Sequence, residues 1–162
     1  MKLLFNIFRI IITIYLLILA YCFAKLYVEK SVYKYDFPTI YDGYTYLEVA
    51  SGSMEPTLKT GDIIIVQKTN DVKVNDIIIY KTEDGLSFVT HRLTNIDGYN
   101  FTTKGDANNT SEQIISDQVV GKVVYYNDNF CKALKILLNP IYIVIIGVVG
   151  IFLPELLFNK VK

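Results

Sequence analysis

Three residues in the middle of this 162-residue chain, Ser53, His91 and Asp106, have side chains of the types that together can perform acyl-transfer chemistry. A serine hydroxyl attacks a carbonyl carbon efficiently only when a nearby base accepts its proton. His91 is the sole histidine, so it is the only histidine that can act as this base. A carboxylate beside the imidazole would orient the ring and stabilise its charged form, and Asp106 is a reasonable supplier. This chemistry needs no metal and no other cofactor.

Each of these residues also has an ordinary structural interpretation. The sequence Ser51-Gly52-Ser53 ahead of Pro56 is typical of a turn with helix-capping hydroxyls. A lone histidine in a strand is more often a structural residue than a catalyst, and an Asx-rich loop such as residues 103–109 commonly follows a strand. A non-catalytic, membrane-tethered β module therefore stays open as an alternative.

The segments that carry these residues have the pattern of short β-strands separated by turns. The expected strands are residues 44–50, 63–68, 76–82, 86–95, 99–104 and 118–126. Asp84-Gly85 and Asp97-Gly98 are typical of hairpin turns. The unbroken apolar runs Ile63–Val66 and Ile77–Ile79 predict strands that are covered on both faces, because a half-exposed antiparallel strand alternates. We therefore expect a mainly β fold with an antiparallel, barrel-like catalytic domain.

Two long apolar segments flank the predicted β domain. Leu3–Ala24 is long enough for a bilayer-spanning helix, which needs roughly 20 mostly apolar residues. A cleavable secretory signal is the alternative, but the residues around Ala24 offer no A-x-A-like cleavage site. Leu134–Phe158 is a second candidate span, in which Asn139-Pro140 resembles a helix entry. A buried core helix is the alternative there, but so small a domain has little room to bury a helix that is apolar all round.

The chain is thus expected to have four parts, which are an N-terminal transmembrane anchor (1–25), an extramembrane β domain (26–133), a C-terminal transmembrane helix (134–158) and a short tail (159–162). Two spans place both termini on the same side of a bilayer, although the flanking lysines do not decide which side. Basic and acidic residues balance at 16 each, which gives a nucleic-acid partner no electrostatic support. Cys22 and Cys131 each lie near a junction of span and domain, and two positions alone do not show whether they pair.

The order of the motifs resembles the type I signal peptidases. Between Val49 and Asn109 the chain contains, in order, S-G-S-M-E-P-T, G-D-I-I-I-V, V-N-D-I-I-I-Y, V-T-H-R-L and K-G-D-A-N-N. Most bacterial members of that family use a lysine as base, and here the matching position is His91. The chain is in this respect similar to the endoplasmic-reticulum branch, found in eukaryotes, archaea and some Gram-positive bacteria.

This resemblance implies a membrane-bound serine endopeptidase that removes N-terminal signal peptides from secreted pre-proteins. It implies Ser53 as nucleophile, His91 as base and Asp106 as the carboxylate that holds the imidazole. The backbone N–H of Ser53 and the hydroxyl of Ser51 would form the oxyanion hole. Eukaryotic members carry a second aspartate several residues beyond the Gly-Asp pair, and Glu112 is the candidate second acid here.

The resemblance also implies the substrate and the location. The expected partners are signal-peptide-bearing pre-proteins and the lipid bilayer, with the substrate pairing as an extended strand along Tyr44–Ala50. Cleavage on the exported side would place the catalytic domain outside the cell membrane and both termini in the cytoplasm. Since only a neutral imidazole acts as a base, activity should fall on acidification through roughly pH 6–7. A self-cleaving repressor on a similar β fold is another alternative, but such proteins lack paired spans and use lysine.

Overall fold

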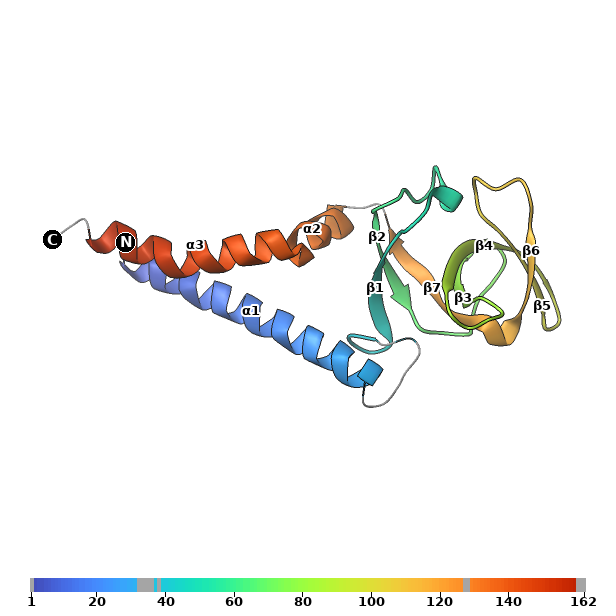
Figure 1. Ribbon diagram of the computed structural model, residues 1–162, viewed down its shortest axis with the longest axis horizontal. Coiled ribbons are helices and arrows are strands. Elements are labelled where there is room, and N and C mark those ends of the chain that lie inside the picture. The colour runs from blue at the N-terminus through green and yellow to red at the C-terminus, as the bar shows by residue number, and fades with distance from the viewer. Residues whose placement is uncertain (1, 32–36, 38, 127–128, 160–162) are drawn as a thin grey trace. The chain divides into compact units, whose positions relative to one another are not determined.

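The computed structural model describes residues 2–31, 37, 39–126 and 129–159 (Figure 1). The chain divides into two compact units. The helical unit consists of Met1–Lys34 and Leu134–Lys162, and the β unit consists of Tyr35–Ala133.

The β unit contains one antiparallel sheet of seven strands in the order β1-β2-β7-β3-β4-β5-β6. The strands are β1 Tyr44–Glu48, β2 Ile63–Gln67, β3 Ile77–Lys81, β4 Phe88–Asp97, β5 Asn100–Lys104, β6 Glu112–Ile115 and β7 Val119–Tyr126. The prediction of a mainly β, antiparallel domain is therefore confirmed. In the described residues the sheet is open, because β1 pairs only with β2 and β6 pairs only with β5. The expected barrel-like closure is not confirmed.

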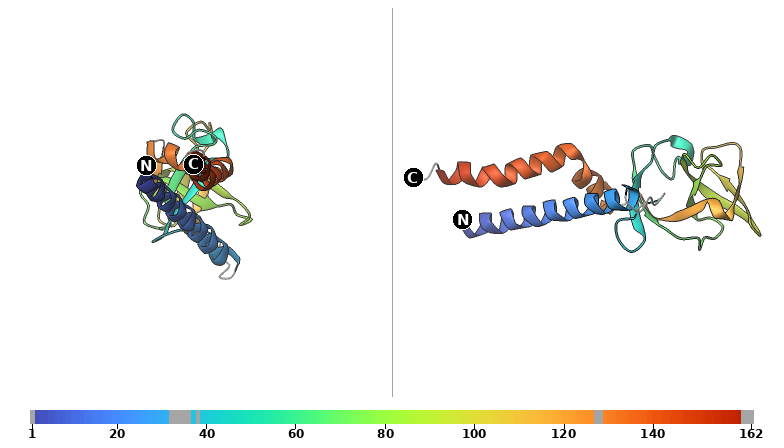
Figure 2. Two further views of the ribbon diagram at one scale, coloured as in Figure 1. Left: turned by 90° about the vertical axis from the view of Figure 1, so that its left-hand side faces the viewer. Right: turned by 60° about the horizontal axis from the view of Figure 1, so that its bottom comes forward.

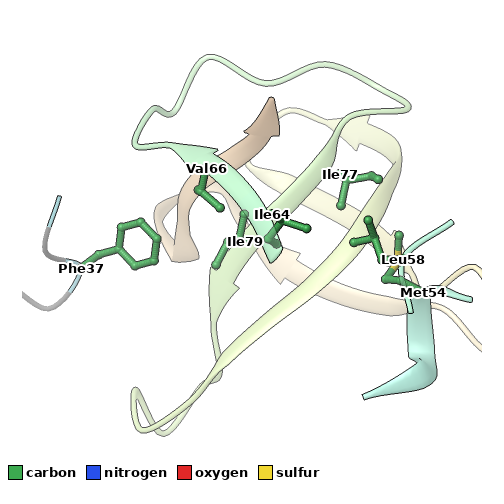
Figure 3. Packing of buried hydrophobic residues seen from close by; sticks show 7 residues of the cluster. All are labelled: Phe37, Met54, Leu58, Ile64, Val66, Ile77 and Ile79. Atoms are coloured by element: carbon green, nitrogen blue, oxygen red, sulfur yellow. The ribbon is translucent and has the colours of Figure 1, made fainter. Parts of the chain in front are cut away.

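Strand β3 lies between two hydrophobic clusters. Ile77 and Ile79 belong to the first cluster, which also contains Phe37, Met54, Leu58, Ile64 and Val66 (Figure 3). Ile78 and Tyr80 belong to the second cluster, together with Leu93, Phe101, Ile114 and Val119. Successive side chains of a strand point to opposite faces of the sheet, so an unbroken apolar run is what a strand between two cores requires. The prediction that this run is covered on both faces is confirmed.

The β4–β5 hairpin turns where the sequence predicts it. Asp97 pairs with Asn100, and Gly98 between them has a φ of 58°, which favours glycine over residues with a Cβ. Strand β6 was not predicted, because a four-residue strand that begins with Glu112 and Gln113 has too few apolar positions to form a pattern.

The helical unit contains α1 Lys2–Ser31, α3 Pro140–Asn159 and the end of α2 Asn129–Leu138. Helices α1 and α3 run side by side in Figures 1 and 2. The contact is close at Gly150, where a Cβ would lie only 2.1 Å from Cδ1 of the buried Ile12. The hydroxyl of Tyr15 donates a hydrogen bond to the carbonyl of Leu137. A small residue such as Gly150 allows two apolar helices to approach each other this closely.

Helix α1 continues past the predicted end of the anchor, and its segment Asn6–Glu29 is long and apolar enough to cross a membrane. The second predicted span is divided in the structure, because α2 and α3 meet at a 72° bend. Among the described residues, α2 and α3 pass the same test only if the bent pair is counted as one span. Asn139 accepts a hydrogen bond from the N–H of Ile141 at 2.9 Å, so the predicted helix entry is confirmed. The C-terminal transmembrane helix itself stays a prediction.

Candidate active site

Ser53 lies on a short 3-10 turn, η1 Gly52–Met54, that follows the edge strand β1. The N–H of Leu58 donates to the carbonyl of Met54 at 2.9 Å. The side chains of Met54 and Leu58 are only 1% and 0% exposed and pack into the first cluster. The buried side chains of Met54 and Leu58 therefore hold the turn on the sheet, while Ser53 itself stays partly accessible.

Two hydroxyl groups meet at this turn. The Oγ atoms of Ser51 and Ser53 are 3.4 Å apart, and either could be the donor. Ser51 has an extended backbone and is exposed. A hydroxyl and a backbone N–H that lie close together, here those of Ser51 and Ser53, are suitable donors for an oxyanion. The structure thus brings together the predicted nucleophile and the predicted side-chain donor of the oxyanion hole.

The two serines line a pocket of about 250 Å³, together with residues 47–50 and 88–90. The first of these segments belongs to β1 and the residues that follow it, and β1 pairs only with β2. The second is the start of β4, which pairs with β3 there but with β5 only from Arg92 onward. In the described sheet each wall of the pocket therefore has one strand edge without a partner. Such edges have backbone groups free to bind an extended peptide.

His91 lies on β4 opposite Ile78 of β3 and is 4% exposed. Its Nδ1 is 3.1 Å from the hydroxyl of Tyr80, and that hydroxyl donates to Oε2 of Glu112 at 2.6 Å. Nδ1 and this carboxylate oxygen are themselves 3.9 Å apart. Burial lowers the pKa of His91 below its ordinary value of 6.5, while the charges of Glu112 and Asp106 partly oppose that effect. The ring is therefore neutral at physiological pH, as a general base must be.

Asp106 is held by two other residues. Its carboxylate accepts hydrogen bonds from Nε and Nη2 of Arg92, at 2.9 and 2.7 Å, and from Oγ1 of Thr57 at 2.5 Å. The bonds from Arg92 are the main reason why the pKa of Asp106 is lowered. Among the described residues Asp106 makes no hydrogen bond to His91, and the nearer carboxylate to that ring is Glu112. Asp106 still acts on His91 through its charge.

The loop that carries Asp106 also contacts the backbone of Ser53, the predicted nucleophile. The N–H of Ala107 donates to the carbonyl of Ser53 at 2.9 Å. A Cβ on Gly105 would lie 2.5 Å from that same carbonyl oxygen, closer than atoms can pack. The Gly-Asp pair therefore has a physical explanation, because glycine permits the close approach and the aspartate fixes the loop to Arg92.

Ser53 and His91 make no hydrogen bond to each other among the described residues, although η1 and β4 are in contact. Hydrogen bonds between catalytic groups are often long in the free enzyme and tighten when substrate binds. Tyr80, Arg92 and Thr57 are parts of this site that were not predicted from the sequence. Tyr80 stands opposite Val89, on the same face as His91, and only the strand register reveals that relation.

Comparisons with known proteins place the chain among serine peptidases. The family described as Peptidase S24-like matches residues 22–124, more than half of the chain. Signal peptidase I W of Bacillus subtilis (strain 168) is 41% identical over 86 residues. That match covers 48% of this chain and 45% of the relative, so the chain spans less than half the length of the protein that it resembles.

Proposed function

Because this chain belongs to the Peptidase S24-like family, we propose that it is a membrane-bound endopeptidase that removes N-terminal signal peptides from secreted pre-proteins. The chain is a serine peptidase and a relative of type I signal peptidases. The observation that carries the proposal furthest is the pocket that Ser51 and Ser53 line between two strand edges that have no partner in the described sheet. A substrate strand would pair with these edges and present its scissile carbonyl to Ser53.

The location follows from the substrate. A signal peptide remains in the bilayer, so an enzyme anchored in the same plane meets it at a raised effective concentration. The apolar segment Asn6–Glu29 of α1 supports such an anchor. We propose that the bent α2–α3 pair adds a second crossing. The β unit would then work on the extracytoplasmic side of the cell membrane, with both termini in the cytoplasm.

The proposed reaction has two steps. Oγ of Ser53 attacks the scissile carbonyl carbon while Nε2 of His91 takes the hydroxyl proton, and the N–H of Ser53 and the hydroxyl of Ser51 stabilise the oxyanion. His91 then protonates the leaving amine, the C–N bond breaks, and the signal peptide stays on Ser53 as an ester. Water attacks this ester while His91 accepts its proton. The C–O bond breaks and the proton returns to Ser53.

Both carboxylates have a role in this proposal. Asp106 raises the pKa of His91 through its charge, so it would stabilise the imidazolium that forms in each step. Its bonds to Arg92 and Thr57 would at the same time keep the nucleophile's loop in place. Glu112 is the carboxylate adjacent to the ring and would stabilise the same charge from the other side of Tyr80.

The proposal is tested with full-length protein in proteoliposomes and a pre-protein that carries a signal peptide. The variants Ser53→Ala and His91→Ala should each lower the cleavage rate by at least about a thousandfold, because Ser53 attacks the carbonyl and gives up its proton while His91 accepts that proton. Ser87→Ala is the matched control, since that exposed serine has no part in the mechanism. Circular dichroism verifies that each variant folds. If either active-site variant cleaved at a near-normal rate, the assignment would be wrong.

A further inference from the structure

Tyr80 stands between the only histidine and the nearest carboxylate. Its hydroxyl oxygen is 3.1 Å from Nδ1 of His91 and 2.6 Å from Oε2 of Glu112. Thr103, which is fully buried, donates from Oγ1 to the same oxygen at 3.4 Å. The phenol therefore has three polar neighbours from three different strands, β4, β6 and β5.

The number of protons shared by Tyr80, His91 and Glu112 decides which group donates each hydrogen bond. A tyrosine hydroxyl has one hydrogen and two lone pairs, whereas a carboxylate can only accept. The 2.6 Å contact between Tyr80 and Glu112 therefore takes the single tyrosine proton. The tyrosine oxygen is left to accept, so the 3.1 Å contact with His91 is a hydrogen bond only if Nδ1 carries a proton. In a neutral imidazole, Nε2 is then without one.

We propose that Tyr80 is a positioning residue that, by linking His91 to Glu112, holds the imidazole in the tautomer with its proton on Nδ1 and leaves Nε2 free to accept the proton of Ser53. The inference rests on the proposed function, because the tautomer has a catalytic consequence only if His91 is the base. In the serine–histidine–aspartate template a carboxylate performs this task directly. Here a neutral phenol performs it and passes the hydrogen bond on to Glu112.

The environment of the phenol suits this role. Burial and the hydrogen bond to Glu112 raise the pKa of Tyr80 above its ordinary value, so its proton stays in place across the physiological range. Tyr80 is only 2% exposed, which keeps water from competing for the ring nitrogen. When His91 becomes charged, the charges that face it are Glu112 from β6 and Asp106 from the loop after β5.

The single histidine makes the tautomer directly measurable. Full-length protein labelled with ¹⁵N only in histidine, free of any affinity tag that adds histidines, gives the NMR signals of one imidazole ring. Above the pKa of His91 we expect a protonated Nδ1 and an unprotonated Nε2. A wild-type ring with its proton on Nε2 would overturn the proposal. The measured tautomer of His91 does not depend on activity, so it separates a failure of this inference from a failure of the proposed function.

Two variants then test whether Tyr80 is the cause. Tyr80→Phe keeps the buried ring and removes only the hydroxyl, so the Nδ1-protonated population should fall and kcat/KM should drop about ten- to hundredfold, the effect of one charge-assisted hydrogen bond. Glu112→Gln, at a half-exposed side chain, replaces the obligate acceptor with a group that can also donate, and should likewise shift the proton toward Nε2.

Tyr99→Phe is the matched control, because this side chain is 81% exposed and its variant should match the wild type in both readouts. In Tyr80→Phe the acid limb of the kcat/KM profile should also move to lower pH, because the charged ring loses a hydrogen-bond acceptor. A change in stability alone would not produce that shift. An unchanged tautomer in Tyr80→Phe would overturn the inference, whatever the activity of that variant.

Discussion

The substitution Asp106→Asn tests what fixes the loop that contacts the backbone of Ser53. Asn keeps the volume of Asp106 and one acceptor oxygen but removes the charge that binds Arg92 at 2.9 and 2.7 Å. The two side chains are 28% and 17% exposed, so the pair lies between a surface pair, worth about 0–1 kcal/mol, and a buried pair, whose disruption costs about 3–5 kcal/mol. We expect a loss of about 2 kcal/mol in the free energy of unfolding at neutral pH.

The pH dependence gives this prediction a second, independent test. The pKa of Asp106 is lowered in the folded protein from an ordinary value of 3.8. Its contribution to stability is therefore fully present above pH 3.8 and is lost as the pH falls through the lower, folded value. The difference between wild type and Asp106→Asn should stay constant from neutral pH down to that range and then shrink.

Urea denaturation of the full-length protein in detergent, followed by near-UV circular dichroism of its tyrosines, measures this difference. Asp97→Asn makes the same chemical change at an exposed site in the hairpin and should leave stability unchanged. A stability equal to wild type, or a difference that grows on acidification, would refute the reasoning. If catalysis fell about 10⁴-fold in a variant of unchanged stability, Asp106 would instead act as the direct orienting acid of a triad.

Two further outcomes are expected. Burial lowers the pKa of His91 below 6.5, so kcat/KM should fall on acidification with a midpoint below that value, and a rate that rises only above about pH 9, where a lysine base would operate, would contradict His91 as the base. Gly105→Ala forces a Cβ to within 2.5 Å of the Ser53 carbonyl oxygen, and the backbone must move. Cleavage of the pre-protein should therefore slow about a hundredfold, and a near-normal rate would show that the close approach does not set the nucleophile's position.

Local patterns were sufficient to predict most of the β unit. The β-branched run Ile77–Ile79 predicted a strand covered on both faces, and both clusters are present. Asp97-Gly98 predicted the hairpin that joins β4 to β5, and Asn139 predicted the start of α3. These features depend on a few neighbouring residues, so the sequence contains them directly. The open edges of the sheet depend on which strands meet, and no local pattern encodes that choice.

Strand register also decides whether Glu112 or Asp106 lies beside the imidazole of His91. Glu112 stands opposite Thr103 on β5, and Thr103 stands opposite Leu93 on β4. Cross-strand partners share a face of the sheet, and so do residues two apart in one strand. Glu112 is therefore on the face that carries His91. Asp106 lies in the loop before β6 and binds Arg92, so its nearness in sequence to Glu112 says nothing about which of the two faces the imidazole.

The adjacent residues His91 and Arg92 explain how one strand serves both halves of the site. Neighbouring side chains of a strand point to opposite faces, so His91 is directed toward Tyr80 and Glu112 while Arg92 binds Asp106 on the other side. Asp106 is in turn bound to Thr57, four residues beyond the proposed nucleophile Ser53, and its loop contacts the Ser53 carbonyl through Ala107. The proposed base and, through Arg92, the loop that contacts Ser53 are thus held by consecutive positions of a single strand. A rigid strand holds such positions more accurately than two independent loops would, so β4 positions both the imidazole of His91 and, through Arg92, the loop that contacts the Ser53 carbonyl.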